Sequence, residues 1–252
     1  LACGMDPSGV MAELTGRSGG YSKGKGGSMH MFSREKNFFG GHGIVGAQVP
    51  LGTGLAFAHN YLKDSNVSLT YLGDGAVNQG QVYESFNMAA LWKLPVVYII
   101  ENNKYGMGTS VARASANPEL LYQRAQGYGI PGQQVDGMDI FSVRQAAKVA
   151  VDRARKGDGP TLLEMRTYRY RGHSMSDPAK YRSKEEVNKM KEEFDPIDRL
   201  LARMKKEFSF TEEQIDHIEA DIRNIVLKAA DFAQKSPEPD VKELYTDILL
   251  NA

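Results

Sequence analysis

The feature that most constrains the fold of this chain is a pair of apolar segments, each of which leads into a short polar motif. Residues 67–72 alternate apolar and polar side chains and lead into Gly73-Asp74-Gly75, and residues 95–100 are continuously apolar and lead into Glu101-Asn102-Asn103. Residues 78–94 between them predict a helix. A strand, a helix and a strand in this order predict a βαβ unit, whose parallel strands end at the same edge of a sheet. The sequence therefore predicts an α/β fold with a mainly parallel central sheet flanked by helices.

An acid and an amide follow the two predicted strands, so Asp74 and Asn103 are expected side by side at the edge where open α/β sheets bind ligands. Magnesium prefers oxygen ligands, usually one or two from the protein and the rest from waters and phosphates. Gly75 lets the backbone approach a phosphate closely. The next helix, with Asn78 as its predicted N-cap and Gln81 three residues later, directs N–H groups to the same region. The pattern favours a magnesium and diphosphate site over the alternative, an aspartate that only caps a helix.

Longer motifs around the acid and the amide, which are 29 positions apart, make this pattern more specific. They are Ala76-Val77-Asn78-Gln79-Gly80-Gln81, Asn87-Met88-Ala89-Ala90-Leu91-Trp92-Lys93-Leu94-Pro95, Glu101-Asn102-Asn103-Lys104-Tyr105-Gly106-Met107-Gly108-Thr109-Ser110 and Tyr168-Arg169-Tyr170-Arg171-Gly172-His173-Ser174-Met175-Ser176-Asp177-Pro178. Together they resemble thiamine-diphosphate enzymes, and among these the alpha subunits of 2-oxo acid dehydrogenases that act on pyruvate. The resemblance extends from about Gly4 to Pro239, which is nearly the whole chain.

This resemblance implies a thiamine-diphosphate-binding fold and gives the motif residues their expected roles. Asp74, Asn103 and the backbone carbonyl of Tyr105 would hold Mg²⁺, which bridges the two phosphates of thiamine diphosphate. Gly75 and Ala76 would lie along the diphosphate. Gly43 and Val45 would line the middle of the cofactor, where the apolar side chain of Val45 could enforce its bent conformation.

His173 is the residue for which the resemblance implies a catalytic role. It lies in a loop that contains Arg169 and Arg171, and Arg182 follows shortly after. These cations predict a positive surface suited to an anionic substrate. A loop histidine is usually only a solvated residue, but the resemblance implies that His173 assists transfer of the acyl group to a lipoyl arm.

The implied reaction is oxidative decarboxylation of pyruvate, with the acetyl group passed to the lipoyl domain of a dihydrolipoyl acyltransferase. The glutamate that activates the cofactor comes from a beta subunit in two-subunit members of this family, and the sequence offers no convincing substitute for it. We therefore expect a partner beta subunit, with two alpha and two beta chains, and no activity of this chain alone. The chain also begins part-way through the expected fold and lacks a Tyr-Arg pair that contacts the diphosphate in the family.

Composition excludes some classes of function. Lysine plus arginine equal aspartate plus glutamate at 31 each, so nothing indicates binding to nucleic acid or to an anionic membrane. No apolar run approaches the 18 or so residues of a membrane span. Cys3 is the single cysteine, which excludes an internal disulfide and fits a reducing compartment. The expected location is the bacterial cytoplasm or the mitochondrial matrix, with the cytoplasm favoured.

The remaining segments predict how the chain is organised. Residues 1–182 are predicted to form the diphosphate-side α/β domain, truncated at its N-terminus, and residues 183–252 a helical C-terminal extension packed on it. The glycine-dense residues 16–46 predict a phosphate- or cofactor-facing loop. Further helices are predicted at residues 46–62, 120–128, 140–156, 184–208 and 211–235, and further strands at 132–137 and 161–165.

Three alternatives stay open at this point. The first is an alpha subunit that acts on branched-chain 2-oxo acids or on acetoin, which differs only in details of the pocket. The second belongs to another class, a non-catalytic nucleotide-binding α/β subunit, although no P-loop or G-x-G-x-x-G motif follows an early strand. The third is a purely structural subunit, against which the intact Asp74, Asn103 and His173 argue.

Overall fold

The computed structural model describes residues 1–249, and its contacts divide them into two compact units. The first unit combines residues 1–43 with residues from Ser209 onward, and the second comprises Ile44–Phe208. The predicted boundary between residues 182 and 183 falls inside the second unit, and the two-domain division proposed from the sequence stays a prediction. None of the described helices is both long and apolar enough to cross a membrane.

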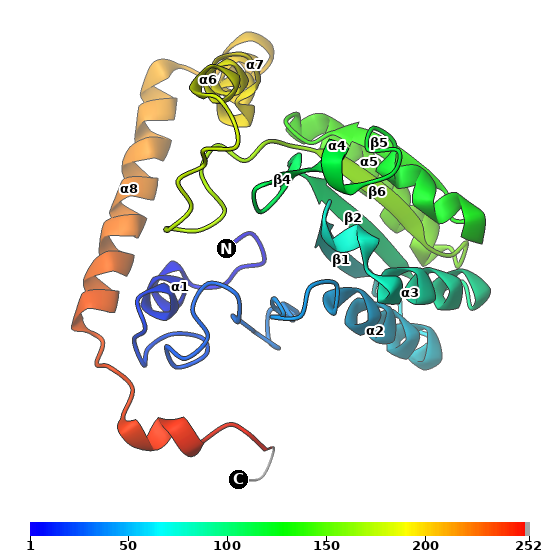
Figure 1. Ribbon diagram of the computed structural model, residues 1–252. Coiled ribbons are helices and arrows are strands. Elements are labelled where there is room, and N and C mark those ends of the chain that lie inside the picture. The colour runs from blue at the N-terminus through cyan, green and yellow to red at the C-terminus, as the bar shows by residue number, and fades with distance from the viewer. Residues whose placement is uncertain (250–252) are drawn as a thin grey trace. The chain divides into compact units, whose positions relative to one another are not determined.

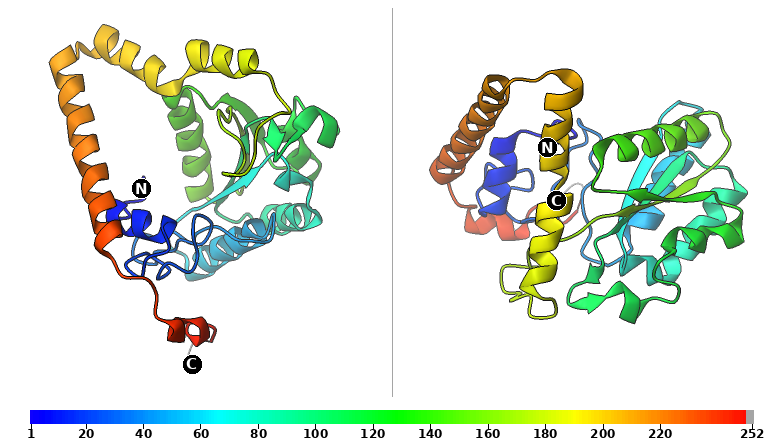
Figure 2. Two further views of the ribbon diagram at one scale, coloured as in Figure 1. Left: turned by 60° about the vertical axis from the view of Figure 1, so that its left-hand side comes forward. Right: turned by 90° about the horizontal axis from the view of Figure 1, so that it is seen from above.

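A four-stranded parallel sheet forms the centre of the second unit, in the order β1-β2-β6-β5. Figures 1 and 2 show α2 and α3 on one face of this sheet and α5 on the other. The α/β class and the parallel flanked sheet predicted from the sequence are therefore confirmed. The bounds of these elements are α2 Gln48–Leu62, β1 Ser68–Gly73, α3 Gly80–Leu91, β2 Val96–Asn102, β5 Gly132–Asp136, α5 Ile140–Arg155 and β6 Thr161–Arg166.

The strand patterns explain these layers. On β1, Ser68, Thr70 and Leu72 are buried, whereas Leu69 and Tyr71 are exposed. The strand alternates as the sequence predicts, but the small polar residues face the core, where α2 packs on Thr70, and Leu69 and Tyr71 face outward. The continuous apolar run of β2 is buried on both faces. Val96, Tyr98 and Ile100 belong to the core cluster that includes α2 and α3, and Val97 and Ile99 belong to the cluster that includes α5.

The small residues of α2 allow it to approach β1 closely. A Cβ atom on Gly52 would lie 2.0 Å from Oγ1 of Thr70, so no larger residue fits there without movement of the buried strand. On the same helix, a Cβ atom on Gly54 would have no heavy atom within 4 Å. The helix predicted over residues 46–62 is therefore confirmed as α2, and it packs closely on β1 at Gly52.

The helix after Asp74 begins later than predicted. Residues Ala76–Asn78 form a 3-10 turn (η1), Gln79 has the extended ψ of 137°, and α3 starts at Gly80. The prediction of Asn78 as N-cap was wrong because its side chain is used elsewhere: its Nδ2 donates to Oγ of Ser115 and its Oδ1 accepts from Arg124.

The predicted helix over residues 184–208 is two helices, α6 (Lys184–Phe194) and α7 (Pro196–Phe208). Pro196 has no N–H group to donate, and the residue before a proline is disfavoured in the helical region. Asp195 accordingly has an extended ψ of 122°, and its carboxylate accepts the N–H of Ile197 at 2.9 Å. The smaller elements of this unit are β3 Tyr105–Gly106, β4 Thr109–Ser110, α4 Val111–Ala114 and η2 Leu121–Tyr128.

The first unit packs α1 (Pro7–Leu14) against α8 (Glu212–Lys235). The helix predicted over residues 211–235 is confirmed as α8, which begins with a capping box: the side chains of Thr211 and Gln214 each accept the other's backbone N–H group. The glycine-rich residues that follow α1 fold around one buried carboxylate. Glu13 has no exposed surface and accepts four backbone N–H groups, from Ser22, Gly24, Gly26 and Gly27, at 2.7–3.1 Å.

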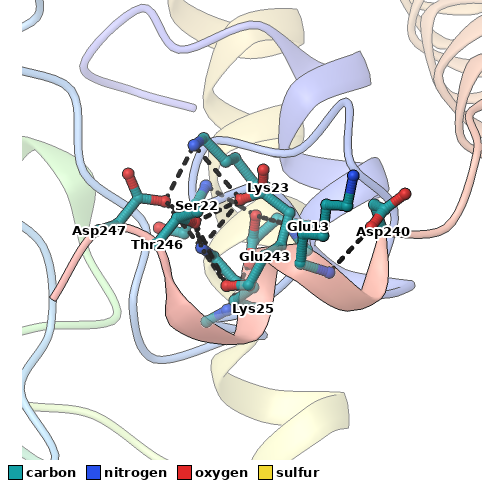
Figure 3. Close-up of polar contacts among 11 residues, drawn as sticks. Glu13, Ser22, Lys23, Lys25, Asp240, Glu243, Thr246 and Asp247 are labelled. Carbon is teal, nitrogen blue, oxygen red and sulfur yellow. Dashed lines mark hydrogen bonds and ion pairs between the residues drawn. The ribbon is translucent and has the colours of Figure 1, made fainter. Parts of the chain in front are cut away.

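A second cluster in this unit joins the glycine-rich segment to the 3-10 helix η3 (Val241–Tyr245), as Figure 3 shows. Lys23 and Lys25 both pair with the carboxylate of Asp247, at 2.9 and 2.7 Å, and both also reach Glu243. Because these charges are exposed to solvent, each pair contributes little to stability. Their effect is to fix where η3 lies on the segment.

Candidate functional site

The two strands predicted to present an acid and an amide end together at one edge of the sheet. Gly73 pairs with Glu101 in the β1–β2 register, which sets Asp74 level with Asn102 and places Asn103 one residue beyond. Asp74 is 3% exposed. Burial raises the pKa of its carboxyl group above the usual range, while hydrogen bonds from its own backbone N–H and that of Asn103, and the charge of Arg169, lower it in part. The structure therefore brings Asp74 and Asn103 together.

Tyr105 reaches the same place through a short turn. The Oδ1 atom of Asn103 accepts the backbone N–H of Tyr105 at 3.1 Å, and β3 then pairs with β4 in a two-stranded ribbon. A Cβ atom on Gly75 would lie 3.7 Å from Cα of Gly106, so the turn after β1 and the start of this ribbon touch backbone to backbone. The carbonyl oxygen of Tyr105 accepts Nη1 of Arg169 at 3.1 Å.

These oxygens fit a hard divalent cation. Asp74 offers a carboxylate that no lysine or arginine of the described residues approaches within ion-pairing distance, and burial makes its charge costly without a cation. Asn103 and Tyr105 each offer an amide-type oxygen with one hydrogen bond made and a second lone pair left. Within residues 1–249, no group of three or more His, Cys, Asp or Glu side chains could hold a metal, so soft or imidazole-rich metal sites are not found there. The donor set suits magnesium, which takes few protein oxygens.

The other residues predicted to bind the cofactor have different environments. Ala76 is buried in η1, directly after Gly75. Val45 is 56% exposed, and its backbone carbonyl accepts Nε2 of Gln81 at 3.0 Å, which holds the Val45 loop at the start of α3. Gly43 is the last residue of the first segment of the first unit, so its place relative to this edge is not described.

His173 lies in an exposed loop whose backbone is held by Asp177. The carboxylate of Asp177 accepts the N–H groups of His173 at 2.7 Å and Ala179 at 2.8 Å, and the hydroxyl of Tyr181 at 2.8 Å. These hydrogen bonds, with that of His173 first, lower the pKa of Asp177 to about 2. The imidazole itself has no recorded hydrogen-bond partner among the described residues, so it is available to a ligand.

Arg169 ties the His173 loop to the ribbon that carries Tyr105. Its guanidinium donates to the carbonyl oxygens of Tyr105 and Met107, at 3.1 and 2.6 Å, and to the hydroxyl of Tyr181 at 2.8 Å. Arg182 likewise donates to the carbonyl oxygens of Arg169 and Arg171. The sequence indicated these arginines as a positive surface, whereas the structure shows two of them bound to backbone oxygens.

Two buried or half-buried glutamates support this edge and were not singled out from the sequence. Glu164, fully buried on β6, accepts Nδ2 of Asn102 at 2.7 Å and the N–H of Tyr122 at 3.1 Å. Glu186 on α6 accepts the hydroxyls of Tyr105 and Tyr168, at 3.1 and 2.7 Å. Burial, and then the bond to Glu186, raises the pKa of Tyr168 to about 12. A glutamate inside an apolar strand, as in Leu162-Leu163-Glu164-Met165, is the signal that could have revealed Glu164.

Comparisons with known proteins agree with this geometry. A family model described as "Dehydrogenase E1 component" matches residues 1–242. A protein described as "Pyruvate dehydrogenase E1 component subunit alpha" from Rhizobium meliloti is 68% identical over 250 residues, which are 99% of this chain and 72% of the relative. One of the same description from Zymomonas mobilis is 61% identical over 253 residues, 99% of this chain and 70% of the relative. A testis-specific mitochondrial form from Rattus norvegicus is 52% identical over 242 residues, 96% of this chain and 61% of the relative.

Proposed function

The chain belongs to the dehydrogenase E1 component family, and on that premise we propose that it is the alpha subunit of a pyruvate dehydrogenase. In this function it takes part in the oxidative decarboxylation of pyruvate and in transfer of the acetyl group to the lipoyl group of an acyltransferase. The observation that carries the proposal is the buried Asp74 carboxylate, which lies beside Asn103 at the carboxyl edge of the sheet. The relatives that match nearly the whole chain are described as alpha subunits of pyruvate dehydrogenase.

The cofactor of this family is thiamine diphosphate, which supplies the carbon nucleophile that attacks the keto carbon of pyruvate and accepts the electrons left when carbon dioxide departs. We assign Asp74, Asn103 and the carbonyl of Tyr105 to Mg²⁺, because they are oxygen donors gathered at one edge. Gly75 and Ala76 would then lie along the diphosphate, and Gly43 and Val45 would line the middle of the cofactor. The protein would contribute binding and orientation, and the bound cofactor would contribute the reactive carbon.

His173 assists transfer of the acetyl group to the lipoyl arm in this proposal. Its imidazole is exposed and free of protein partners among residues 1–249, while Asp177 fixes its backbone. A ring that is accessible but carried on an anchored loop can donate or accept a proton at an incoming substrate. Asp177 acts on the reaction only through the position of His173.

A beta subunit completes the site, because the glutamate that activates the cofactor is expected from that chain. The name shared by the relatives implies a multienzyme complex with such a subunit and an acyltransferase. We propose an assembly of two alpha and two beta chains, which receives the lipoyl domain of the acyltransferase. We place it in the bacterial cytoplasm rather than the mitochondrial matrix.

Reconstitution tests the proposal directly. The chain is co-expressed with a candidate beta subunit and assayed with thiamine diphosphate and Mg²⁺ for turnover of pyruvate, 3-methyl-2-oxobutanoate and acetoin. We expect turnover of pyruvate above the other two substrates, and none from either chain alone. Preference for a branched-chain acid or for acetoin would reassign the substrate, and decarboxylation by the purified alpha chain would contradict the shared site.

Calorimetry separates the enzyme from a non-catalytic nucleotide-binding subunit. The reconstituted complex should bind thiamine diphosphate only when Mg²⁺ is present, and the Asp74→Ala complex should not bind it under the same conditions. Binding of a nucleotide in place of thiamine diphosphate would favour the non-catalytic function.

A further inference from the structure

A cavity lies in the α/β unit at the opposite edge of the sheet from Asp74. It has a volume of about 200 Å³ and is lined where α2 ends, where β2 begins at Pro95, and where α5 ends. The loop that leads into β1 completes its wall. Because strands β1 and β2 are parallel, this amino-terminal edge is a full strand length away from their carboxyl ends. The cavity therefore belongs to a different site from the one assigned to the cofactor.

The lining of this cavity has an excess of positive charge. Lys63, Lys93 and Arg155 line it, against one acid, Asp64. Asp64 is already engaged, because its carboxylate bonds to Nδ1 of His59 at 2.9 Å and accepts the N–H of Asn66 at 2.9 Å. The His59 contact, followed by the Asn66 bond, lowers the pKa of Asp64. The three cations against Asp64 give these charged side chains of the lining two net positive charges.

In the part of the chain that the structure describes, none of the three cations forms an ion pair, and the one acid whose charge interacts with them is Asp152, near Arg155. Neither lysine ammonium takes part in an ion pair or a hydrogen bond there, and Arg155 uses only its Nε, which donates to the carbonyl of Ser65 at 3.3 Å. The terminal N–H groups of its guanidinium are left for another acceptor. Unpaired cations that converge on a concave surface attract a counter-ion.

The backbone at the two lysines gives an independent argument. Lys63 and Lys93 have φ of +59° and +49°, the left-handed conformation that follows many helices and that glycine adopts at no steric cost. The third helix that ends at this cavity, α5, has glycine at the corresponding place, Gly157 with φ of +79°. Lysine at two such positions is less favourable than glycine would be, which indicates that the side chains serve a purpose.

Cations near helix C-termini also stabilise the helix dipole. Stabilisation of the helix dipole depends on charge alone. Lysines in the last helical turns, where the backbone is not strained, would provide it equally well. It does not account for three cations around one cavity. The charge of the lining matches a phosphate monoester, which carries nearly two negative charges near neutral pH.

We propose that this cavity binds the phosphate group of a small phosphorylated metabolite, with Lys63, Lys93 and Arg155 as its ligands. The volume of about 200 Å³ is below the 300–1,000 Å³ typical of sites for drug-sized ligands, so the ligand is small. Arginine and lysine are the usual side chains that donate hydrogen bonds to phosphate, and arginine adds a planar pair of N–H groups.

The test uses the reconstituted alpha and beta complex saturated with thiamine diphosphate and Mg²⁺, so that the cofactor site is filled. It is titrated calorimetrically with inorganic phosphate and with glycerol 3-phosphate at constant ionic strength. We expect saturable binding of one phosphate per alpha chain, at concentrations below about 10 mM. In the double variant Lys63→Gly, Lys93→Gly we expect the affinity to fall at least about tenfold, because two charge-assisted hydrogen bonds are lost.

Glycine is chosen because it accepts the left-handed backbone at both positions, so the variant should fold as the wild type does. Arg155→Gln is a second variant at a position of ordinary backbone conformation, and it too should weaken binding. The control is Lys235→Gln, which removes an exposed lysine that pairs with Asp231 on α8 of the other unit and should leave binding unchanged. The proposal would be overturned if the wild type showed no saturable binding of phosphate. It would also be overturned if the double variant and Arg155→Gln both bound phosphate as tightly as the wild type.

Discussion

At the scale of single residues, Asp74 is a group whose charge is unfavourable in the folded chain by itself. Burial raises its pKa above that of an aspartate in the unfolded chain. A group with a raised folded pKa contributes stability below its unfolded pKa, and that contribution is lost as the pH rises through the folded pKa. At neutral pH the ionised carboxylate therefore costs stability until a cation is bound.

We predict from this that Asp74→Asn has opposite effects with and without the cofactor. Without it, the variant should unfold at the same temperature as the wild type or higher, because the buried charge is gone. With thiamine diphosphate and Mg²⁺ at about one hundred times the wild-type dissociation constant, the wild type should gain about 2.7 kcal/mol and the variant almost nothing. Thermal unfolding of the reconstituted complex in both conditions measures this. Asp152→Asn, an exposed aspartate on α5, should keep the full cofactor effect.

Asp177 has a pKa shifted in the other direction. Its pKa of about 2 lies below the usual value for aspartate, so its contribution is present above the unfolded pKa and is lost as the pH falls toward 2. The anchoring of the His173 loop should therefore not change between pH 5 and pH 8.

We predict that Asp177→Asn loosens this loop, because an amide offers one acceptor oxygen where the carboxylate has two, which together accept three hydrogen bonds. Limited proteolysis with trypsin should cut after Arg171 and Lys180 several-fold faster in the variant. Ser176→Ala, in the same loop, removes only a contact with Ser174 and should be cut at the wild-type rate. An unchanged cleavage rate in Asp177→Asn would mean that the loop is held by other contacts.

At the scale of elements, α2 approaches β1 closely at Gly52. We predict that Gly52→Ala destabilises the protein by about 1–3 kcal/mol, because its methyl group would overlap the buried side chain of Thr70. Gly54→Ala, two residues along the same helix, faces open space and should stabilise by up to about 1 kcal/mol through helix propensity. Urea unfolding of both variants measures the difference, and a similar effect of the two substitutions would contradict the packing of α2.

Elements were predictable where side-chain pattern alone decides them. The buried run of β2 and the capping box of α8 were visible in the sequence, and so was the alternation of β1, although not that its polar residues face the core. The break at Pro196 was missed because charged residues with helical spacing continue on both sides of it, although the proline itself was the signal. The start of α3 was missed because the partners of Asn78, which are Ser115 and Arg124, are far from it in sequence.

The same reasoning explains what could be predicted of the site. The strand ends placed Asp74 and Asn103 together, because parallel strands in a βαβ unit must end at one edge. The hydrogen bonds from Arg169 to Tyr105 and Met107 could not be predicted, because the acceptors are backbone carbonyl oxygens. The types of the residues do not encode where their backbone oxygens lie. The same holds for Glu13, whose donors are all backbone N–H groups.

At the scale of the whole molecule, Glu13 holds together the segment that completes the first unit. We predict that Glu13→Gln lowers the free energy of unfolding by roughly 2 kcal/mol, because an amide offers one acceptor oxygen and turns an N–H₂ group toward buried N–H donors. The matched control is Glu238→Gln, whose exposed carboxylate pairs with Arg17 and should change stability by less than about 0.5 kcal/mol. Urea unfolding compares them, and equal losses would exclude a special role for Glu13.

The first unit is built from two stretches of chain that are far apart in sequence, and this has a consequence for synthesis. The glycine-rich segment closes on Ser236, Pro237 and η3, which leave the ribosome long after it does. At about 5–20 residues per second, the delay is on the order of ten to forty seconds. During this time the α/β unit can fold alone, while the segment around Glu13 waits exposed. A chaperone would therefore meet the glycine-rich segment around Glu13 for longer than it meets the α/β unit.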